Sequence, residues 1–247
     1  MNISSTYRRM GPRRVKPYFA EFRSDIASFL AREVLDAAVQ TGRFELPPGP
    51  CKYVAFVDPS GGGQDAMTLA VAHREGDRMR PVAVLDMVRE VRPPFQPSEV
   101  VASFASDLRR YGCREVQGDA YAGEWPREQF RLHGIDYKRA ERSKSDIYRE
   151  CLPLLNSGRV ELLDVPRIVT QFAGLERRTS RGTGRDVIDH MPGAHDDIAN
   201  AAAGALLAAV GGGMSSTLDR WLALGGRGGA PRGNIGEERR EGDPPRF

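Results

Sequence analysis

Long apolar segments are missing from this 247-residue chain. No apolar run reaches the length of about eighteen residues that a membrane-spanning helix needs. The first residues, MNISSTYRRMGPRR, also lack the apolar stretch of a secretory signal. We therefore expect a soluble, cytoplasmic protein with no membrane partner, whose 40% hydrophobic residues allow a sizeable core.

Cysteine is scarce, and one nucleotide-binding motif is absent. Cys51, Cys113 and Cys151 are widely spaced and form no CxxC pair, so the sequence predicts neither a disulfide framework nor a zinc site. We expect them to be small buried apolar residues. No GxxxxGK[ST] sequence occurs, and we therefore expect no ATP hydrolysis by this chain.

Lysine is scarce as well, whereas arginine is abundant. Four of the 36 basic residues are lysines, which leaves 32 arginines. Arginine pairs bidentately with phosphate, so its excess over lysine would suit a nucleic-acid-binding protein. The base composition of the gene could produce the same excess of arginine. The net charge of +3 is only mildly basic and does not by itself identify a nucleic-acid-binding protein.

The chain divides into three parts by composition. A basic leader is followed by apolar residues at helical spacing over residues 22–39, which predict one amphipathic helix. The prolines of LPPGP at 46–50 cannot continue a helix and indicate a boundary near residue 50. We expect a leader and linker helix over 1–50, a folded domain over 51–210, and a disordered Gly/Arg/Pro-rich tail over 211–247.

Predicted strands and helices follow one another in a definite order between these boundaries. Short apolar runs at 53–57, 67–73 and 82–91 predict three consecutive strands in an antiparallel meander. Further strands are expected at 115–117, 135–138 and 159–163, and helices at 97–111, 123–133, 144–156, 166–178 and 195–210. This order predicts an α/β sandwich in which a mixed sheet is flanked by helices.

Acidic residues stand at two predicted strand ends and at the start of the last helix. Asp58 follows YVAFV and precedes PSGGG, and Asp119 ends EVQGD just before a helix. The alanine-rich helix opens with His195, Asp196 and Asp197. Taken singly, Asp58 fits a turn and Asp119 a helix N-cap, and paired acids suit the positive end of a helix dipole.

Together, these acids from three distant segments predict a metal site. Like charges that converge on one point require a cation to be tolerated. Carboxylate ligands suit Mg²⁺ or Mn²⁺, and two such ions stabilise the attacking and leaving oxygens in phosphodiester cleavage. We therefore expect a two-metal nuclease with ligands Asp58, Asp119, Asp196 and Asp197.

The motifs DPSGGGQD, GDAYAG and DHMPGAHDDIANA, in this order, resemble the C-terminal nuclease domain of the large terminase subunit of tailed bacteriophages. The segment KSDIYRECLPLLNSGRVELLDVP is also similar to that family, and the resemblance covers residues 20–210. It implies a ribonuclease H-like fold, two divalent metals, and cutting of concatemeric viral DNA during genome packaging.

The resemblance also implies roles for single residues. Asp58 would bridge both metals, Asp119 would hold one of them, and Asp196 or Asp197 would complete the site. His195 would orient a carboxylate or the attacking water, or cap a helix.

Asp65, seven residues after Asp58, is a candidate accessory ligand. The Walker motifs of the terminase motor are missing here. The implied partners are double-stranded DNA, a separate packaging ATPase, the terminase small subunit and the portal protein, in the cytoplasm of an infected or lysogenic bacterial host.

Basic residues near the third motif are the candidate DNA contacts. We expect a flexible cationic loop over 177–185, with Arg177, Arg178, Arg181 and Arg185, and a further contact from Lys144. Such residues bind phosphates without sequence preference, but a solvated loop has the same composition.

Two other classes of protein stay open. A junction resolvase or transposase of the same superfamily would share the acids, and an idle remnant would bind DNA or a packaging partner without cleaving.

Overall fold

The structure, a computed structural model, describes residues 26–119, 123–179 and 186–211. Residues 1–25 of the predicted leader and linker segment, and all but the first residue of the predicted tail, lie outside the described residues. In the described part, no helix is long and apolar enough to cross a membrane.

Seven strands form one mixed sheet in the order β2–β8–β5–β4–β3–β6–β7. Their bounds are β2 Val39–Gln40, β3 Tyr53–Asp58, β4 Met67–Glu75, β5 Val82–Val91, β6 Glu115–Gly118, β7 Asp136–Arg139 and β8 Val160–Leu163. The strands β3, β4 and β5 pair antiparallel, whereas β6, β7, β8 and β2 join through parallel pairs. The predicted meander and mixed sheet are therefore confirmed.

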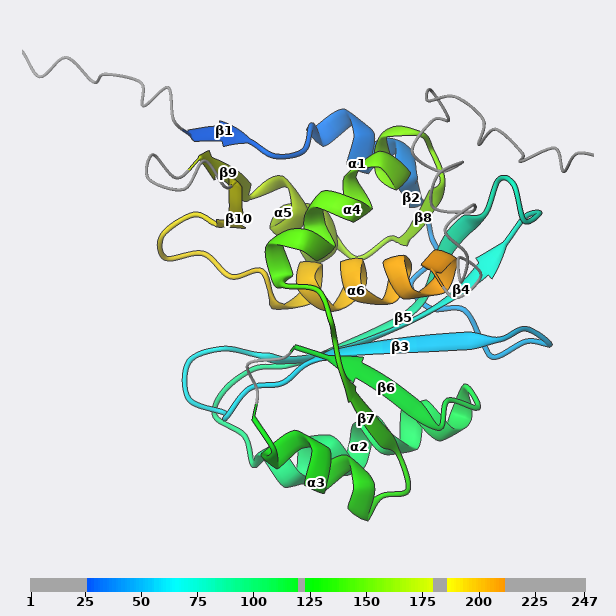
Figure 1. The fold of residues 1–247 in the computed structure, drawn as a ribbon, viewed down its shortest axis with the longest axis vertical. Coiled ribbons are helices and arrows are strands. Elements are labelled where there is room, and N and C mark those ends of the chain that lie inside the picture. The colour runs from blue at the N-terminus through cyan, green and yellow to red at the C-terminus, as the bar shows by residue number, and fades with distance from the viewer. Residues whose placement is uncertain (1–25, 120–122, 180–185, 212–247) are drawn as a thin grey trace, which may run out of the picture.

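Helices cover both faces of this sheet (Figure 1). On one face lie α2 (Pro97–Arg110) and α3 (Trp125–Leu132), which bury one apolar cluster. On the other lie α1 (Arg32–Ala38), α4 (Lys144–Asn156), α5 (Pro166–Ala173) and α6 (Asp197–Gly211), which bury a second. Because β4 lies between the two clusters, its first seven residues are all buried, as expected for a central strand.

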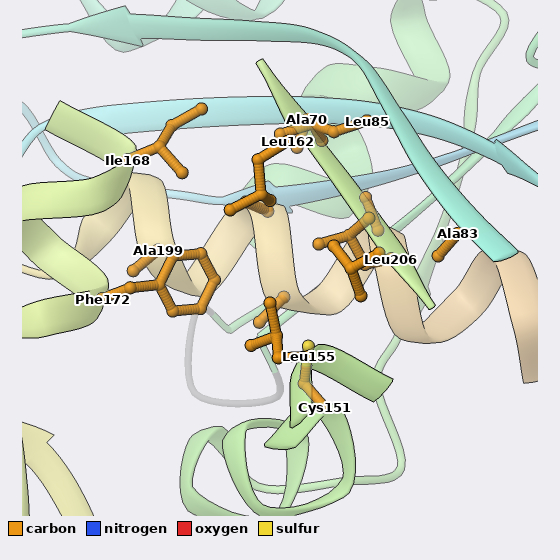
Figure 2. Close-up of a cluster of buried hydrophobic side chains, with 14 of the residues drawn as sticks. Ala70, Ala83, Leu85, Cys151, Leu155, Leu162, Ile168, Phe172, Ala199 and Leu206 are labelled. Carbon is orange, nitrogen blue, oxygen red and sulfur yellow. The ribbon is translucent and has the colours of Figure 1, made fainter. Parts of the chain in front are cut away.

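The helix α6 lies in the middle of the second cluster. Figure 2 shows Ala199 and Leu206 of α6 surrounded by side chains from α4, α5 and the sheet, among them Leu155, Phe172 and Leu85. Its small residues permit a close approach to β3, because a Cβ at Gly204 would overlap the ring of Phe56. This packing fixes where the first residues of α6 reach the sheet edge.

The N-terminal helix is shorter than the predicted span 22–39. The strand β1 (Ile26–Ser28) precedes α1, and the backbone N–H of Phe29 donates to the carbonyl of Leu175 at 3.0 Å. Pairing with a distant strand therefore takes the backbone that a longer helix would have used. The structure also packs Phe29, Leu30 and Leu35 into the same core as α6, so this segment contributes to the fold.

The predicted helix 166–178 is wrong in its second half. The helix α5 ends at Ala173, and β9 (Leu175–Thr179) follows as the central strand of a small sheet with β1 and β10 (Asp186–His190). Residues 176–178 are all charged, and pairing on both sides of β9 outweighs their low preference for a strand. Among the cysteines, Cys113 and Cys151 are buried as expected, whereas Cys51 is exposed.

Candidate active site

Two neighbouring strands bring Asp58 and Asp119 to one edge of the sheet. The strand β3 ends at Asp58, and β6 runs parallel to it with Val57 opposite Gly118, directly before Asp119. Gly118 permits this arrangement because a Cβ there would overlap the ring of Tyr137. Ligand sites of open α/β sheets commonly lie at such carboxyl ends.

The start of α6 is fastened to the same edge. The hydroxyl of Thr68, opposite Asp58 on β4, donates to the backbone carbonyl of Asp197 at 2.8 Å. One turn further along α6, the Asn200 amide Nδ2 donates to Asp58 Oδ2 at 2.8 Å. Residues 197 and 200 share one helical face, so both point toward the end of β3.

All four predicted acids line one cavity of about 480 Å³. The lining also includes Asp65, Lys144 and His195 from the prediction, and His190 and Asn200, which the sequence reasoning missed. The structure thus brings the predicted acidic residues together from β3, β6 and α6.

Asp58 has an unusual charge environment. Its pKa is raised to about 7, mainly by burial and then by the negative charges of Asp197, Asp119 and Asp196, while the hydrogen bond from Asn200 lowers it. The pKa of Asp197 is also raised, first by burial and then by Asp196 and Asp65. Without a cation, this part of the cavity therefore disfavours ionised carboxylates.

Asp196 differs from Asp58 and Asp197 because a basic side chain lies against it and balances its negative charge. Lys144 Nζ donates to Asp196 at 3.3 Å and to Asp189 Oδ1 at 2.8 Å, and the buried Tyr148 hydroxyl donates to Asp196 Oδ2 at 2.9 Å. Burial opposes the charge of Lys144, but its hydrogen bond with Asp189 and the charge of Asp196 raise its pKa to about 12. Lys144 therefore lies inside the acidic cavity and neutralises part of it.

A second group of ligand atoms lies beside Lys144. Asp189, His190 and Asp196 offer atoms within 4.8 Å of one another. His190 Nδ1 lies 2.8 Å from the carbonyl of Met191 and must carry its proton to donate there, which leaves Nε2 as the acceptor when the ring is neutral. This nitrogen lies 4.0 Å from Asp196 Oδ1.

His195 and Asp65 lie at the mouth of the cavity. Their side chains are 51% and 69% exposed, and His195 Nδ1 lies 3.8 Å from Asp65 Oδ1. The same nitrogen lies 4.0 Å from Asp197 Oδ2. The structure therefore joins these two residues to the acidic cavity through Asp197.

The predicted cationic loop is partly a strand. Arg177 and Arg178 belong to β9, where Arg178 pairs with Glu176 at 2.8 Å and Arg177 lies 3.6 Å from Asp186. We expected both arginines in a flexible loop, but the structure places them on a paired strand, each beside an acidic side chain. Arg181 and Arg185 lie outside the described residues.

The residues missed from the sequence differ in how visible they were. Asn200 is a polar residue in the apolar helix IANAAAGALLAAV, three positions after Asp197, and that spacing was a usable signal. Asp189 and His190 belong to the third motif itself. Tyr148, by contrast, reads as an ordinary core residue of α4, and only the packing of α4 against α6 places its hydroxyl on Asp196.

The donor set fits a hard divalent cation. Carboxylates dominate the cavity, and burial with like charge disfavours their ionisation unless positive charge is added. The Oδ1 atom of Asn200 is buried and has no hydrogen-bond partner in the described structure, as expected where a ligand or water completes the site. Asp58, Asp119 and Asp197 are the residues suited to hold such an ion.

The sequence matches no protein-family model and no curated protein. Solved structures match it well. The large terminase nuclease from the thermophilic phage G20c with bound magnesium aligns with a TM-score of 0.58 at 18% identity, over 72% of this chain and 96% of that one. The chain has the fold of the large terminase nuclease.

The same terminase nuclease fold occurs in other phage structures. The nuclease domain of the large terminase subunit of bacterial virus Sf6 aligns with a TM-score of 0.55 at 14% identity, over 73% of this chain and 98% of that one. The large terminase of bacteriophage HK97 aligns with a TM-score of 0.56 at 16% identity, over 73% of this chain but 44% of that one. The match therefore spans whole nuclease domains and less than half of the HK97 protein.

Proposed function

We propose that this chain is a divalent-metal-dependent DNA endonuclease. The observation that carries the proposal is the convergence of Asp58, Asp119 and Asp197 in one cavity, where Asp58 has a pKa raised to about 7. A buried acidic cluster of this kind is costly unless a cation binds it, so function is the natural reason for its presence. The terminase nuclease fold supports cleavage of a nucleic-acid backbone.

Two ion positions follow from the two groups of ligands. The first ion would be held by Asp58, Asp119 and Asp197, and the second by Asp189, His190 and Asp196, where the Lys144 ammonium would compete with it. Since Lys144 and Tyr148 occupy Asp196, we assign Asp197 as the main ligand from α6. Divalent cations such as Mg²⁺ or Mn²⁺ supply positive charge to the scissile phosphodiester and activate water for attack.

The protein's own side chains prepare the reaction. Asn200 Nδ2 holds one oxygen of Asp58 and thereby fixes the orientation of that carboxylate. His195 Nδ1 faces Asp65 and Asp197, and we assign to its Nε2 the proton released by the attacking water. Lys144 donates a hydrogen bond to Asp196 and offers positive charge to a DNA phosphate that enters the cavity.

The biological role we infer is cutting of concatemeric phage DNA during genome packaging. Support comes from the terminase structures with the same fold. In this role double-stranded DNA is the substrate, and the packaging ATPase, the terminase small subunit and the portal protein are the partners. The setting is the cytoplasm of an infected or lysogenic bacterium, and the nuclease unit includes α1 as well as residues 51–210.

Plasmid nicking tests the nuclease proposal. With Mn²⁺ present, the wild-type protein is expected to nick supercoiled plasmid, and Asp58→Ala is expected to abolish nicking while the circular dichroism spectrum stays unchanged. Asp36→Ala is the matched control, because Asp36 lies on α1 with a 56% exposed side chain paired to Arg32. Undiminished nicking by Asp58→Ala would refute the assignment, and no nicking by the wild type with any divalent metal would favour the idle, DNA-binding protein.

A further inference from the structure

A second groove lies directly beside the acidic cavity. It has a volume of about 680 Å³, within the range of about 300–1,000 Å³ that is typical of small-molecule sites. Its walls are the β3–β4 turn at residues 59–61, the start of α2 at 96–98, and Trp125, Pro126 and Gln129 of α3. The groove is therefore large enough for a ligand the size of a nucleobase.

The lining of this groove differs sharply from that of the acidic cavity. The described residues that line it are all uncharged, and Trp125 among them is a large aromatic residue that is 39% exposed. The amides of Gln96 and Gln129 carry both hydrogen-bond donors and acceptors. A flat aromatic surface with neutral amides suits a nucleobase, whereas a phosphate would need positive charge.

The groove and the acidic cavity share a wall. Pro59, Ser60 and Gly61 line both, and they follow Asp58 directly in the chain. A nucleotide whose phosphate lies at Asp58 therefore has this groove next to it. The continuity makes the neighbouring base of the same strand the natural occupant.

The shared wall is closely packed against the start of α2. The Ser60 hydroxyl donates to the backbone carbonyl of Asp65 at 2.7 Å, which closes the turn upon itself. Gly62 has a φ of +81°, and a Cβ there would lie 2.7 Å from the carbonyl oxygen of Phe95, just before α2. The turn and the segment before α2 thus lie in close contact, and the groove between them is present in the structure without a ligand.

We propose that this groove binds an unpaired nucleobase of the DNA strand that is held in the acidic cavity, with the indole of Trp125 stacked on the base. The proposal rests on the proposed nuclease function and deepens it. A base within a duplex is already stacked on both sides, so a base on Trp125 must leave the helix. The preferred substrate is therefore DNA with an unpaired nucleotide beside the cut, such as a frayed end or a single strand.

Tryptophan fluorescence tests this proposal directly, because the chain has two tryptophans, Trp125 and Trp221. In a His195→Ala, Trp221→Phe protein, Trp125 is the single reporter, the carboxylates Asp58, Asp119 and Asp197 are kept, and cleavage of the probe is blocked by loss of the proton acceptor. Titration in Mg²⁺ with a short oligodeoxythymidylate should quench this fluorescence. An oligonucleotide of the same length without bases should not quench it.

Binding affinities give a second readout. Stacking of a base on an aromatic residue predicts that Trp125→Ala weakens oligodeoxythymidylate binding by roughly 5- to 150-fold. Affinity for the base-free oligonucleotide should not change. Leu132→Ala is the matched control, because Leu132 is a 66% exposed apolar residue of the same helix that does not line the groove, and it should bind like the wild type.

Several results would overturn the proposal. These are unchanged fluorescence at the end of the titration, equal quenching by the base-free oligonucleotide, or wild-type affinity in a folded Trp125→Ala protein. If Trp125→Ala does not fold, the fluorescence titration decides alone. Quenching without plasmid nicking by the wild type would reject the nuclease function and support base binding in the groove. Nicking without quenching would support the nuclease function and reject base binding.

Discussion

The raised pKa of Asp58 predicts that the metal-free protein loses stability as the pH rises. The pKa of Asp58 shifts from an ordinary 3.8 to about 7. At about 1.4 kcal/mol per pKa unit, this shift lowers the free energy of unfolding by at most about 4 kcal/mol. Asp58 is partly exposed, which lowers the expected effect. For a protein of this size, each 1 kcal/mol corresponds to about 2–4 °C, so we expect a change in Tm of about 5–15 °C.

The sign follows from which state holds the proton. Below pH 4, the Asp58 carboxyl is protonated in both folded and unfolded protein. Between pH 4 and 7 the folded protein keeps this proton and the unfolded chain does not, so stability falls as the pH rises through this window. Above pH 7 both states are ionised, and the full destabilisation persists.

The assay is thermal unfolding in EDTA from pH 4 to pH 8.5 for the wild type and Asp58→Asn. The variant is the control because its neutral amide keeps an oxygen for the Asn200 donor and removes the titration. Carboxylates with a lowered pKa, such as Asp189 and Asp146, raise stability as the pH rises. They are present in both proteins, so their effect cancels in the difference between the two Tm values.

The Tm of Asp58→Asn relative to that of the wild type should increase as the pH rises, and the difference should be largest at pH 8. Mn²⁺ should stabilise the wild type more at pH 8 than at pH 5, since ionised Asp58 binds it. Parallel wild-type and Asp58→Asn curves in EDTA would refute the reasoning.

Three further substitutions test other parts of the site. Asn200→Asp removes the donor to Asp58 and adds a buried charge, so unfolding in EDTA at pH 8 should show a loss of about 3 kcal/mol that Mn²⁺ partly restores; no loss would contradict this. Gly204→Val should destabilise by about 1–3 kcal/mol or more by chemical denaturation through overlap with Phe56, unlike Gly211→Ala at the open end of α6. Lys144→Met frees Asp189 and Asp196, and calorimetric titration should show more Mn²⁺ bound per chain; unchanged stoichiometry would remove the second ion position.

The sequence predicted the part of the site that depends on strand ends. Asp58 and Asp119 follow short apolar runs, and parallel neighbours must end at the same edge of the sheet, so their proximity follows from strand order. The start of α6 was equally visible, because an apolar alanine-rich helix has to lie in the core. Local pattern thus predicted the acids and the mixed sheet that carries them.

Contacts between distant segments were beyond the sequence. The Lys144 ammonium reaches Asp196 only because α4 packs on α6, and nothing local distinguishes it from a surface lysine. The strand β9 has a charged sequence that resembles a helix surface, and its pairing with β1 joins residues about 150 positions apart. The groove at Trp125 likewise arises from three segments, each unremarkable alone.

One measurement tests the central claim most directly: a Mn²⁺ titration of the wild type and Asp58→Asn, followed by calorimetry and by plasmid nicking on the same samples. We predict that the wild type binds Mn²⁺ and nicks DNA over the same concentration range. Asp58→Asn, folded and with a higher Tm in EDTA at pH 8, should lose both. Nicking by Asp58→Asn at the wild-type rate, or Mn²⁺ binding unaffected by the substitution, would contradict a metal-dependent nuclease at this cavity.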